Sequence, residues 1–196
     1  NQRSIAGHAR TVADSFGYST SSGGLLLNLP FCGVFGFCQA LASLAAGRPG
    51  ILSTAFDAGE TVRQIDEYGI EYLVGTDDML EALLDASDRD IALPSVKWAG
   101  TARFATDFDR FYAKAESRGL KLVGLYGMSE VQALFAVQPL DVAADERTFG
   151  GGRMVNAEAR ARARNPDTGA ILPPGEHGEL ELSGPSLMSE YYLNPE

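Results

Sequence analysis

Histidine, cysteine and tryptophan are scarce in this sequence, and the motifs that depend on them are missing. The 196 residues include two histidines, two cysteines and one tryptophan. No Cys and His cluster has metal-site spacing, and neither a lysine-containing phosphate loop nor a dinucleotide fingerprint occurs. No G-x-S-x-G sequence supports a serine hydrolase triad. Cys32 and Cys38 share one apolar segment, so we expect both to be buried thiols of a reducing compartment.

Basic residues and long apolar runs are also few. Lysine and arginine number 16 against 26 acidic residues, which gives a formal charge of −10. Such a balance argues against binding to nucleic acid or anionic lipid, since both depend on basic patches. No apolar run approaches the roughly 18–20 residues of a membrane-spanning helix, and residues 1–10 lack the apolar core of a signal peptide. We therefore expect a soluble, cytoplasmic protein without a nucleic-acid partner or membrane span.

Strand-like and helix-like segments alternate through the first two thirds of the chain. Short connections between such segments are typical of a parallel sheet with helices on its faces. Ligands of these sheets bind beyond the carboxyl ends of the strands, here the loops that begin at Asn28, Gly100 and Tyr126. The expected strands are residues 25–27, 51–52, 70–74, 96–99 and 120–125. The expected helices are residues 35–44, 58–68 behind Asp57, about 107–118, and one behind Thr76 that carries Met79, Leu80, Leu83 and Leu84.

The pattern changes near Arg147 to a period of two. Residues 157–164 and 178–183 alternate as strands with one solvated face do, and turn sequences separate them. The prediction is an α/β fold: a parallel-rich sheet flanked by helices in residues 1–148, then a β-rich segment in residues 149–196 that begins a β-barrel. Arginines 153, 160, 162 and 164 form the basic cluster of that segment, which we interpret as a solvated strand face rather than an anion site.

Three segments carry a family resemblance. They read LPFCGVFGF at residues 29–37, VGLYGMSE at 123–130, and GEL, SGPS and YYLNPE within 178–196. Their order and spacing resemble the adenylate-forming superfamily, which includes acyl-CoA synthetases, peptide-synthetase adenylation domains and firefly luciferase. The resemblance covers essentially all 196 residues. It implies that the chain is the middle part of the N-terminal domain of such an enzyme.

The resemblance also implies a reaction and its cofactors. Enzymes of this superfamily join a carboxylate to AMP with release of pyrophosphate, then usually pass the acyl group to a thiol. ATP or AMP, Mg²⁺ and coenzyme A would be required, with Ser129 and Glu130 as catalytic residues and Glu130 as the Mg²⁺ ligand. By resemblance the nucleotide would lie against Gly100, Thr101, Ala102, Gly124, Leu125, Tyr126, Gly127 and Ser129, and the acid against Phe31, Cys32, Gly33, Phe35, Gly36 and Met128.

The chain departs from the family pattern at several places. Gly33 stands where members often have the histidine of Pro-x-x-His-x-x-Gly, although Pro30 and Gly36 are kept. Arg103 replaces the usual proline after the adenine loop, and Glu190 replaces a glycine. The family's lysine-containing phosphate loop, its ribose-binding aspartate and its C-terminal domain with the catalytic lysine are absent from these residues. We therefore expect a central portion of a longer enzyme that is inactive by itself.

The apolar first segment favours a fatty or aromatic acid over an amino acid, and thus an acyl-CoA synthetase. Two alternatives stay open: a peptide-synthetase-type adenylation domain that delivers to a carrier protein, and a non-catalytic α/β interaction module. The expected partners are a small carboxylic acid, ATP, CoA and the missing N- and C-terminal parts of the same enzyme, and a homo-oligomer is compatible with the sequence.

Overall fold

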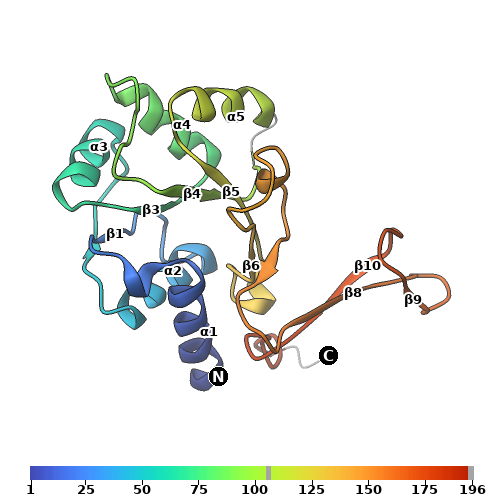
Figure 1. Cartoon of the computed structure of the whole chain (residues 1–196). Helices are drawn as coiled ribbons and strands as arrows, with labels where there is room; N and C mark the ends of the chain where they lie inside the picture. The colour runs from blue at the N-terminus through green and yellow to red at the C-terminus, as the bar shows by residue number, and fades with distance from the viewer. Residues whose placement is uncertain (105–106, 194–196) are drawn as a thin grey trace.

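The computed structural model describes residues 1–104 and 107–193 and contains a central sheet with helices on both faces (Figure 1). The sheet has the strand order β3-β4-β5-β6-β7. The first three strands pair in parallel. The fourth strand pairs antiparallel with the third, and the fifth pairs antiparallel with the fourth. The predicted parallel sheet is confirmed, whereas its antiparallel extension was not predicted. The strands are β3 (Tyr72–Val74), β4 (Trp98–Thr101), β5 (Leu122–Tyr126), β6 (Ala136–Val137) and β7 (Arg153–Met154).

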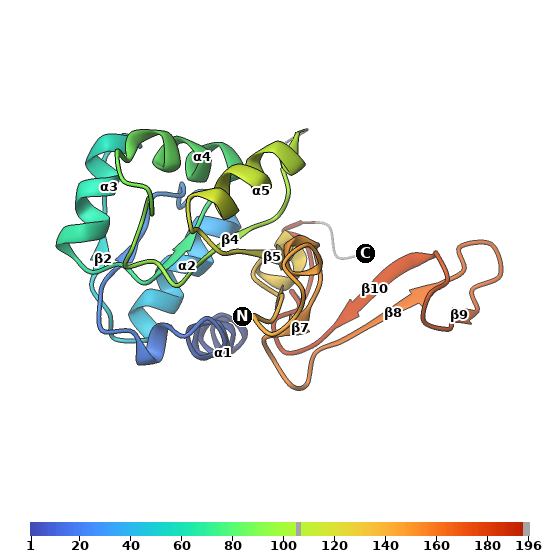
Figure 2. The same ribbon diagram turned by 45° about the horizontal axis from the view of Figure 1, so that its top comes forward.

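Helices cover both faces of this sheet (Figures 1 and 2). Beside it lies a small parallel sheet of β1 (Leu25–Leu26) and β2 (Gly50–Ile51). The helices on one face are α3 (Ala58–Glu67), α4 (Asp77–Ala86) and α5 (Phe108–Ser117), and those on the other are α1 (Gln2–Ser15) and α2 (Val34–Ala45). Three short 3₁₀ helices are η1 (Tyr18–Thr20), η2 (Ser129–Val131) and η3 (Glu146–Thr148).

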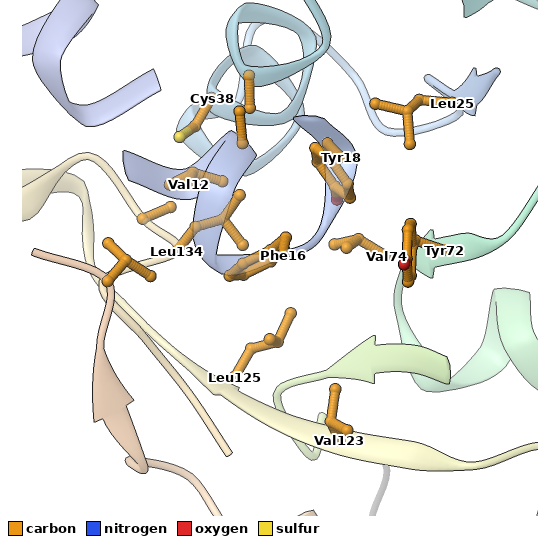
Figure 3. Close-up of a cluster of buried hydrophobic side chains, with 14 of the residues drawn as sticks. Val12, Phe16, Tyr18, Leu25, Cys38, Tyr72, Val74, Val123, Leu125 and Leu134 are labelled. Carbon is orange, nitrogen blue, oxygen red and sulfur yellow. The ribbon is translucent and has the colours of Figure 1, made fainter. Parts of the chain in front are cut away.

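The side chains of the strands alternate between two apolar cores. Tyr72 and Val74 of β3 pack with α1 and α2, while Leu73 between them packs with α3, α4 and α5. Figure 3 shows the first core, in which Phe16, the residue after α1, lies between the sheet residues and α2. Successive residues of a strand point to opposite faces, so the near-continuous apolar strands of the sequence are explained by burial on both sides.

The helix starts predicted from the sequence are confirmed. The Asp57 side chain accepts a hydrogen bond from the backbone N–H of Glu60 at 2.7 Å, and Thr76 does the same for Met79 at 3.4 Å. These oxygens satisfy amides that the first helical turn leaves unpaired. Helix α3 is followed by Gly69 at φ 58°, a left-handed conformation that glycine adopts without penalty.

The last part of the chain forms an arm that projects from the α/β body in both views (Figures 1 and 2). It is a three-stranded antiparallel sheet with the order β10-β8-β9. Within residues 1–104 and 107–193, no strands close into a barrel. The division after residue 148 stays a prediction, and β7 pairs with β6 across it. The strands of the arm are β8 (Arg160–Arg164), β9 (Ile171–Leu172) and β10 (Glu179–Ser183).

Three arginines of the predicted cluster, at positions 160, 162 and 164, lie on β8 of the arm, whereas Arg153 lies on β7 of the central sheet. Arg162 and Arg164 both donate to the carboxylate of Glu181 on the neighbouring strand, the latter through Nε at 2.6 Å. The hydrogen bonds from Arg164 and then Arg162 lower the pKa of Glu181 to about 2. The guanidinium groups are therefore partnered within the arm, and their side chains remain in contact with solvent.

The prediction that both cysteines are buried is wrong for Cys32. Cys38 is buried in the core between α1 and α2, but Cys32 is exposed. Cys32 precedes α2, where the chain turns at the surface, so its apolar neighbours in sequence do not enclose it. In the part of the chain that the structure describes, no helix combines the length and apolar character needed to cross a membrane.

Candidate functional site

A pocket lies where two of the predicted loops, those after β4 and β5, meet the start of α2. It brings residues from the start of α2 together with the loop after β4 and the YGMS segment after β5. Phe35, predicted for the acid, thus lies opposite Ala102 and Tyr126, predicted for the nucleotide. The lining residues are Val34, Phe35, Ala102, Phe104, Leu125, Tyr126, Gly127, Met128, Ser129, Ala133 and Leu134.

The volume of this pocket indicates part of a ligand site rather than a complete one. It measures about 170 Å³, below the roughly 300–1,000 Å³ of typical small-molecule sites. A second cavity of about 490 Å³ lies beyond the carboxyl ends of β1 and β2, where Phe31 and Met79 contribute to its wall. A third, of about 470 Å³, lies near Trp98 and Val123 and contains none of the predicted site residues.

Glu130 stands directly after the pocket-lining Ser129 in the short helix η2. Its carboxylate accepts a hydrogen bond from the Tyr191 hydroxyl, and its backbone carbonyl accepts one from the Met188 N–H at 2.7 Å. The hydrogen bond from Tyr191 holds the pKa of the Glu130 carboxyl below its usual range and raises that of Tyr191. Ser129 is exposed and lines the pocket, whereas Glu130, the next residue, is partly buried and is not among the residues that line it.

The chain after Glu130 follows an uncommon backbone path. Gln132, Ala133 and Leu134 have φ angles of 66°, 52° and 41°, so three successive residues with side chains are left-handed. Such conformations are costly for residues other than glycine and persist where surrounding contacts hold them. One such contact comes from helix α1, where His8 Nε2 lies 2.9 Å from the carbonyl oxygen of Ala133.

The buried ring of His8 predicts a pH dependence of stability. A carbonyl oxygen only accepts, so Nε2 carries the proton, while Nδ1 has no partner among the described residues. Burial lowers the pKa of His8 below its ordinary value of 6.5. The hydrogen bonds to the backbone of Ala133 and Gln132 raise the pKa, but their effect is smaller than that of burial. The stabilisation from a neutral His8 is complete above pH 6.5 and is lost as pH falls through the lowered pKa.

We therefore expect the free energy of unfolding to fall by up to about 1.4 kcal/mol between pH 7.5 and pH 5.5. The variant His8→Gln should lose this part of the pH dependence, because it has no titrating ring. Denaturant unfolding of both proteins at the two pH values measures the difference. Equal pH dependence in both proteins would show that His8 does not change its protonation on unfolding.

Three residues predicted to contact the nucleotide lie behind the pocket wall. The Thr101 hydroxyl is fully buried and donates to the carboxylate of Asp77 at the start of α4. A Cβ atom at Gly100 would lie 2.8 Å from the Leu125 side chain, and one at Gly124 would lie 1.9 Å from the Phe149 carbonyl oxygen. These positions therefore set the packing of β4 and β5, and Gly100, Thr101 and Gly124 do not line the pocket.

The two glycines at the start of α2 differ in their packing: Gly33 is the residue before the helix, and Gly36 lies in its first turn. A Cβ atom at Gly36 would lie 2.6 Å from the carbonyl oxygens of Leu29 and Pro30, so a glycine is required there. At Gly33 the nearest atom would be the Pro30 oxygen at 3.5 Å, an ordinary contact. Gly33 is exposed and, like Cys32, lines neither of the two cavities beside it.

The loop after β4 has a left-handed residue at Arg103. Its φ of 56° is one that proline, fixed near −65°, cannot adopt. The guanidinium carbon lies 4.2 Å from the ring centre of Phe108 and 4.7 Å from that of Phe149, and the group pairs with Asp109 at 3.6 Å. The side chain is thus held against these rings, while its neighbours Ala102 and Phe104 line the pocket.

Several site residues were missed by the sequence analysis. Val34 and Phe104 had only their position next to predicted residues as a signal, and Ala133 and Leu134 had none. Tyr191 belongs to the third motif, but no pattern indicated its bond to Glu130. The last residues of that motif, Asn194, Pro195 and Glu196, lie outside the described residues.

The oxygen donors of Ser129 and Glu130 are too few to enclose a metal ion by themselves. They suit a hard cation that a phosphate group also binds. Among the described residues, no three His, Cys, Asp or Glu side chains group as metal ligands. Glu130 contributes one carboxylate beside the Ser129 hydroxyl. Since Mg²⁺ is usually held by one or two carboxylates, substrate phosphates and water, these residues fit Mg²⁺.

The chain is similar to known proteins along nearly its whole length. Residues 2–192 match the family described as "AMP-binding enzyme". Peroxisomal OPC-8:0-CoA ligase 1 of Arabidopsis thaliana is 25% identical over 202 residues, which is 100% of this chain and 36% of that protein. Feruloyl-CoA synthase of an Amycolatopsis species is 31% identical over 160 residues, covering 80% of this chain and 31% of the relative.

The fold is also similar to a solved structure. The crystal structure of ATP-bound MatB from Rhodopseudomonas palustris superposes with a TM-score of 0.82 at 23% identity, over 100% of this chain and 38% of that one. At this identity the likeness concerns the fold alone. The chain spans about a third of the length of the curated relatives it matches, in agreement with a pocket that is only partly enclosed.

Proposed function

The chain belongs to the AMP-binding enzyme family, and we propose that it is the central part of an ATP-dependent acyl-CoA synthetase. The reaction joins a carboxylate to AMP with release of pyrophosphate and then forms a thioester with coenzyme A. The observation that carries the proposal is the pocket lined by Phe35, Ala102, Tyr126 and Ser129, with Glu130 next to Ser129 in η2.

Each motif residue has a proposed role in this reaction. The loop at Ala102 and the Tyr126 ring would enclose the adenine, with Gly127 beside Tyr126 in the pocket wall. Gly127 packs closely there, because a Cβ atom would lie 2.7 Å from the Ala133 backbone. The Ser129 hydroxyl would bond a phosphate oxygen, and Glu130 would hold Mg²⁺. When bound, Mg²⁺ would reduce the repulsion between the carboxylate and the triphosphate, two anions that must be brought into line.

The acid is proposed to be fatty or aromatic. Val34, Phe35 and Leu134 present an apolar wall to the pocket, and Phe31 presents another to the cavity beside it. One relative is named OPC-8:0-CoA ligase 1, and another is named feruloyl-CoA synthase. These names support CoA as the acceptor rather than a carrier protein, and an enzyme rather than an interaction module.

The rest of the proposal follows from composition and resemblance. The chain would work together with the preceding and following parts of the same enzyme, in the cytoplasm. Residues 1–148 would supply the acyl and adenine subdomain, and residues 149–196 part of a barrel subdomain. Assembly as a homo-oligomer is compatible with this arrangement.

The proposal is tested in a complete enzyme, a polypeptide containing this chain with the segments before and after it. ATP–pyrophosphate exchange with a panel of fatty, aromatic and amino acids measures adenylation. Addition of CoA or a carrier protein then identifies the acceptor. Exchange that depends on a fatty or aromatic acid, followed by acyl-CoA formation, supports the proposal. Exchange with amino acids alone, or none with any acid, would contradict it.

A prediction concerns Gly33, the residue before α2, which directly precedes the pocket residues Val34 and Phe35. The open space around Gly33 means that Gly33→His should fold normally. If the added ring fills part of the acyl site, activity with the larger acids should fall by about 10-fold or more relative to the smaller ones, since pocket contacts discriminate by such factors.

The measurement is the exchange rate across a series of acids of increasing length, with Gly33→Ala as the matched control. Equal relative rates for wild type and Gly33→His along the series would show that Gly33 does not contact the acid.

A further inference from the structure

Glu130 is held at two points by a segment that lies far away in the sequence. The Tyr191 hydroxyl donates to its carboxylate, and the Met188 N–H donates to its carbonyl oxygen at 2.7 Å. The donors are 61 and 58 residues beyond Glu130. Both the backbone position of Glu130 and the direction of its side chain therefore depend on residues 185–191, which we call the return segment.

Gln132 connects the same segment to the turn after Glu130. Its side-chain amide donates to the Ser186 carbonyl oxygen at 2.9 Å and to the Ser4 hydroxyl oxygen at 2.7 Å. The Ser4 hydroxyl in turn donates to the Pro185 carbonyl oxygen at 2.7 Å. The amide thus uses its N–H groups to tie helix α1, the turn and the return segment together.

These bonds counteract the strain of the turn. Gln132 is the first of the three left-handed residues, and its side chain is fixed between Ser4 and Ser186, both buried. These bonds act together with the His8 contact to the Ala133 carbonyl oxygen to hold the left-handed path. Glu130 lies only two residues before Gln132 in the chain. A change at Gln132 would therefore be transmitted to the carboxylate through the backbone.

We propose that Tyr191 and Gln132 are positioning residues for Glu130, and that the return segment fixes where its carboxylate meets a divalent cation. This inference rests on the proposed function, in which Glu130 holds Mg²⁺. A carboxylate offers about four acceptor sites, so a bond from Tyr191 leaves room for a cation. Mg²⁺ demands near-ideal octahedral geometry, and partners that orient a ligand typically change metal affinity 10–100-fold.

The test uses Tyr191→Phe in the complete enzyme, with Tyr192→Phe as the matched control. Tyr192 is the next residue, is 92% exposed and has the same chemistry. We expect Tyr191→Phe to weaken binding of Mn²⁺ with ATP by about 10-fold, measured by electron paramagnetic resonance without an acid substrate. The Mg²⁺ concentration for half-maximal pyrophosphate exchange should rise by the same factor, with the unfolding midpoint equal to that of Tyr192→Phe.

A second variant, Gln132→Met, keeps the side-chain length and removes both donors. Its expected effect is faster hydrogen exchange at the Met188 amide, together with weaker Mn²⁺ binding. Tyr191→Phe lacks only the contact to the carboxylate, so it decides the proposal even where Gln132→Met unfolds. Equal Mn²⁺ binding in Tyr191→Phe and Tyr192→Phe would overturn the inference.

Glu130→Gln separates this failure from that of the proposed function. If Glu130→Gln also leaves Mn²⁺ binding unchanged, Glu130 is not a metal ligand and both assignments fall. If Glu130→Gln weakens binding while Tyr191→Phe matches its control, the metal ligand stands and the positioning role alone is wrong.

Discussion

In the complete enzyme, Glu130→Gln is expected to lower acid-dependent ATP–pyrophosphate exchange by about 10²–10³, the usual loss when one transition-state electrostatic contact is removed. The substitution changes charge with little change of shape. A glutamine oxygen can still accept the Tyr191 hydroxyl, and the backbone carbonyl still accepts from Met188. The fold of the turn should therefore survive, and the loss should come from the missing negative charge toward Mg²⁺.

The neighbouring acid Glu190 supplies the control. It is exposed and lies next to Tyr191, so Glu190→Gln removes the same charge from the same region without touching the pocket. Exchange rates at saturating and at limiting Mg²⁺ should be unchanged in this variant. If Glu130→Gln keeps wild-type exchange, or if both variants lose it equally, Glu130 is not the metal ligand.

The sequence predicted much of the α/β part of the fold because local signals agreed with tertiary packing. Asp57 and Thr76 cap helices where they were expected, and the apolar run at residues 120–125 became a strand buried on both faces. The extension of the sheet was missed because β6 and β7 are two-residue strands. So short a segment shows no period, and its pairing is decided by distant residues.

The predicted site residues remain a prediction, and the structure shows which of them line one pocket. The family motif placed Tyr126, Ser129 and Glu130 at one edge of the sheet, where the structure has a pocket. It also named Gly100 and Gly124 for the nucleotide, although close packing against Leu125 and Phe149 explains both glycines. A pattern of residue types does not distinguish a glycine that admits a ligand from one that admits a neighbouring strand or loop.

The bond between Tyr191 and Glu130 shows a second limit. The two residues were assigned to separate motifs, and their contact depends on how the arm returns to the body after β10. The left-handed path at Gln132 is equally hidden, because glutamine carries no preference for that conformation. Both features arise from tertiary contacts, and local sequence gives no signal for either.

Gly124→Ala is expected to destabilise the chain by about 3 kcal/mol or more, at the upper end of overpacking effects. An added Cβ would lie 1.9 Å from the Phe149 carbonyl oxygen and 3.0 Å from the Thr148 carbonyl carbon. These are backbone atoms, so no side-chain rotation can relieve the clash. The segment after η3 would have to move away from β5.

That movement would also break a buried polar contact. The Arg147 guanidinium of η3 is 7% exposed and donates through Nε to the Leu122 carbonyl oxygen on β5 at 2.9 Å, with Glu116 3.3 Å away. Pulling η3 from the strand would leave a buried charge poorly hydrogen-bonded, which adds to the cost. Since β5 leads directly to Tyr126, the displacement would reach the pocket wall as well.

Denaturant unfolding of the 196-residue chain measures the effect, with Gly59→Ala as the control. Gly59 is exposed in the first turn of α3, and the nearest atom to its added Cβ is Asp57 Oδ1 at 3.6 Å. Because alanine is the better helix former, this control should gain up to about 0.5–1 kcal/mol. A Gly124→Ala protein that unfolds within about 0.5 kcal/mol of wild type would mean that residues 148–149 do not pack on β5.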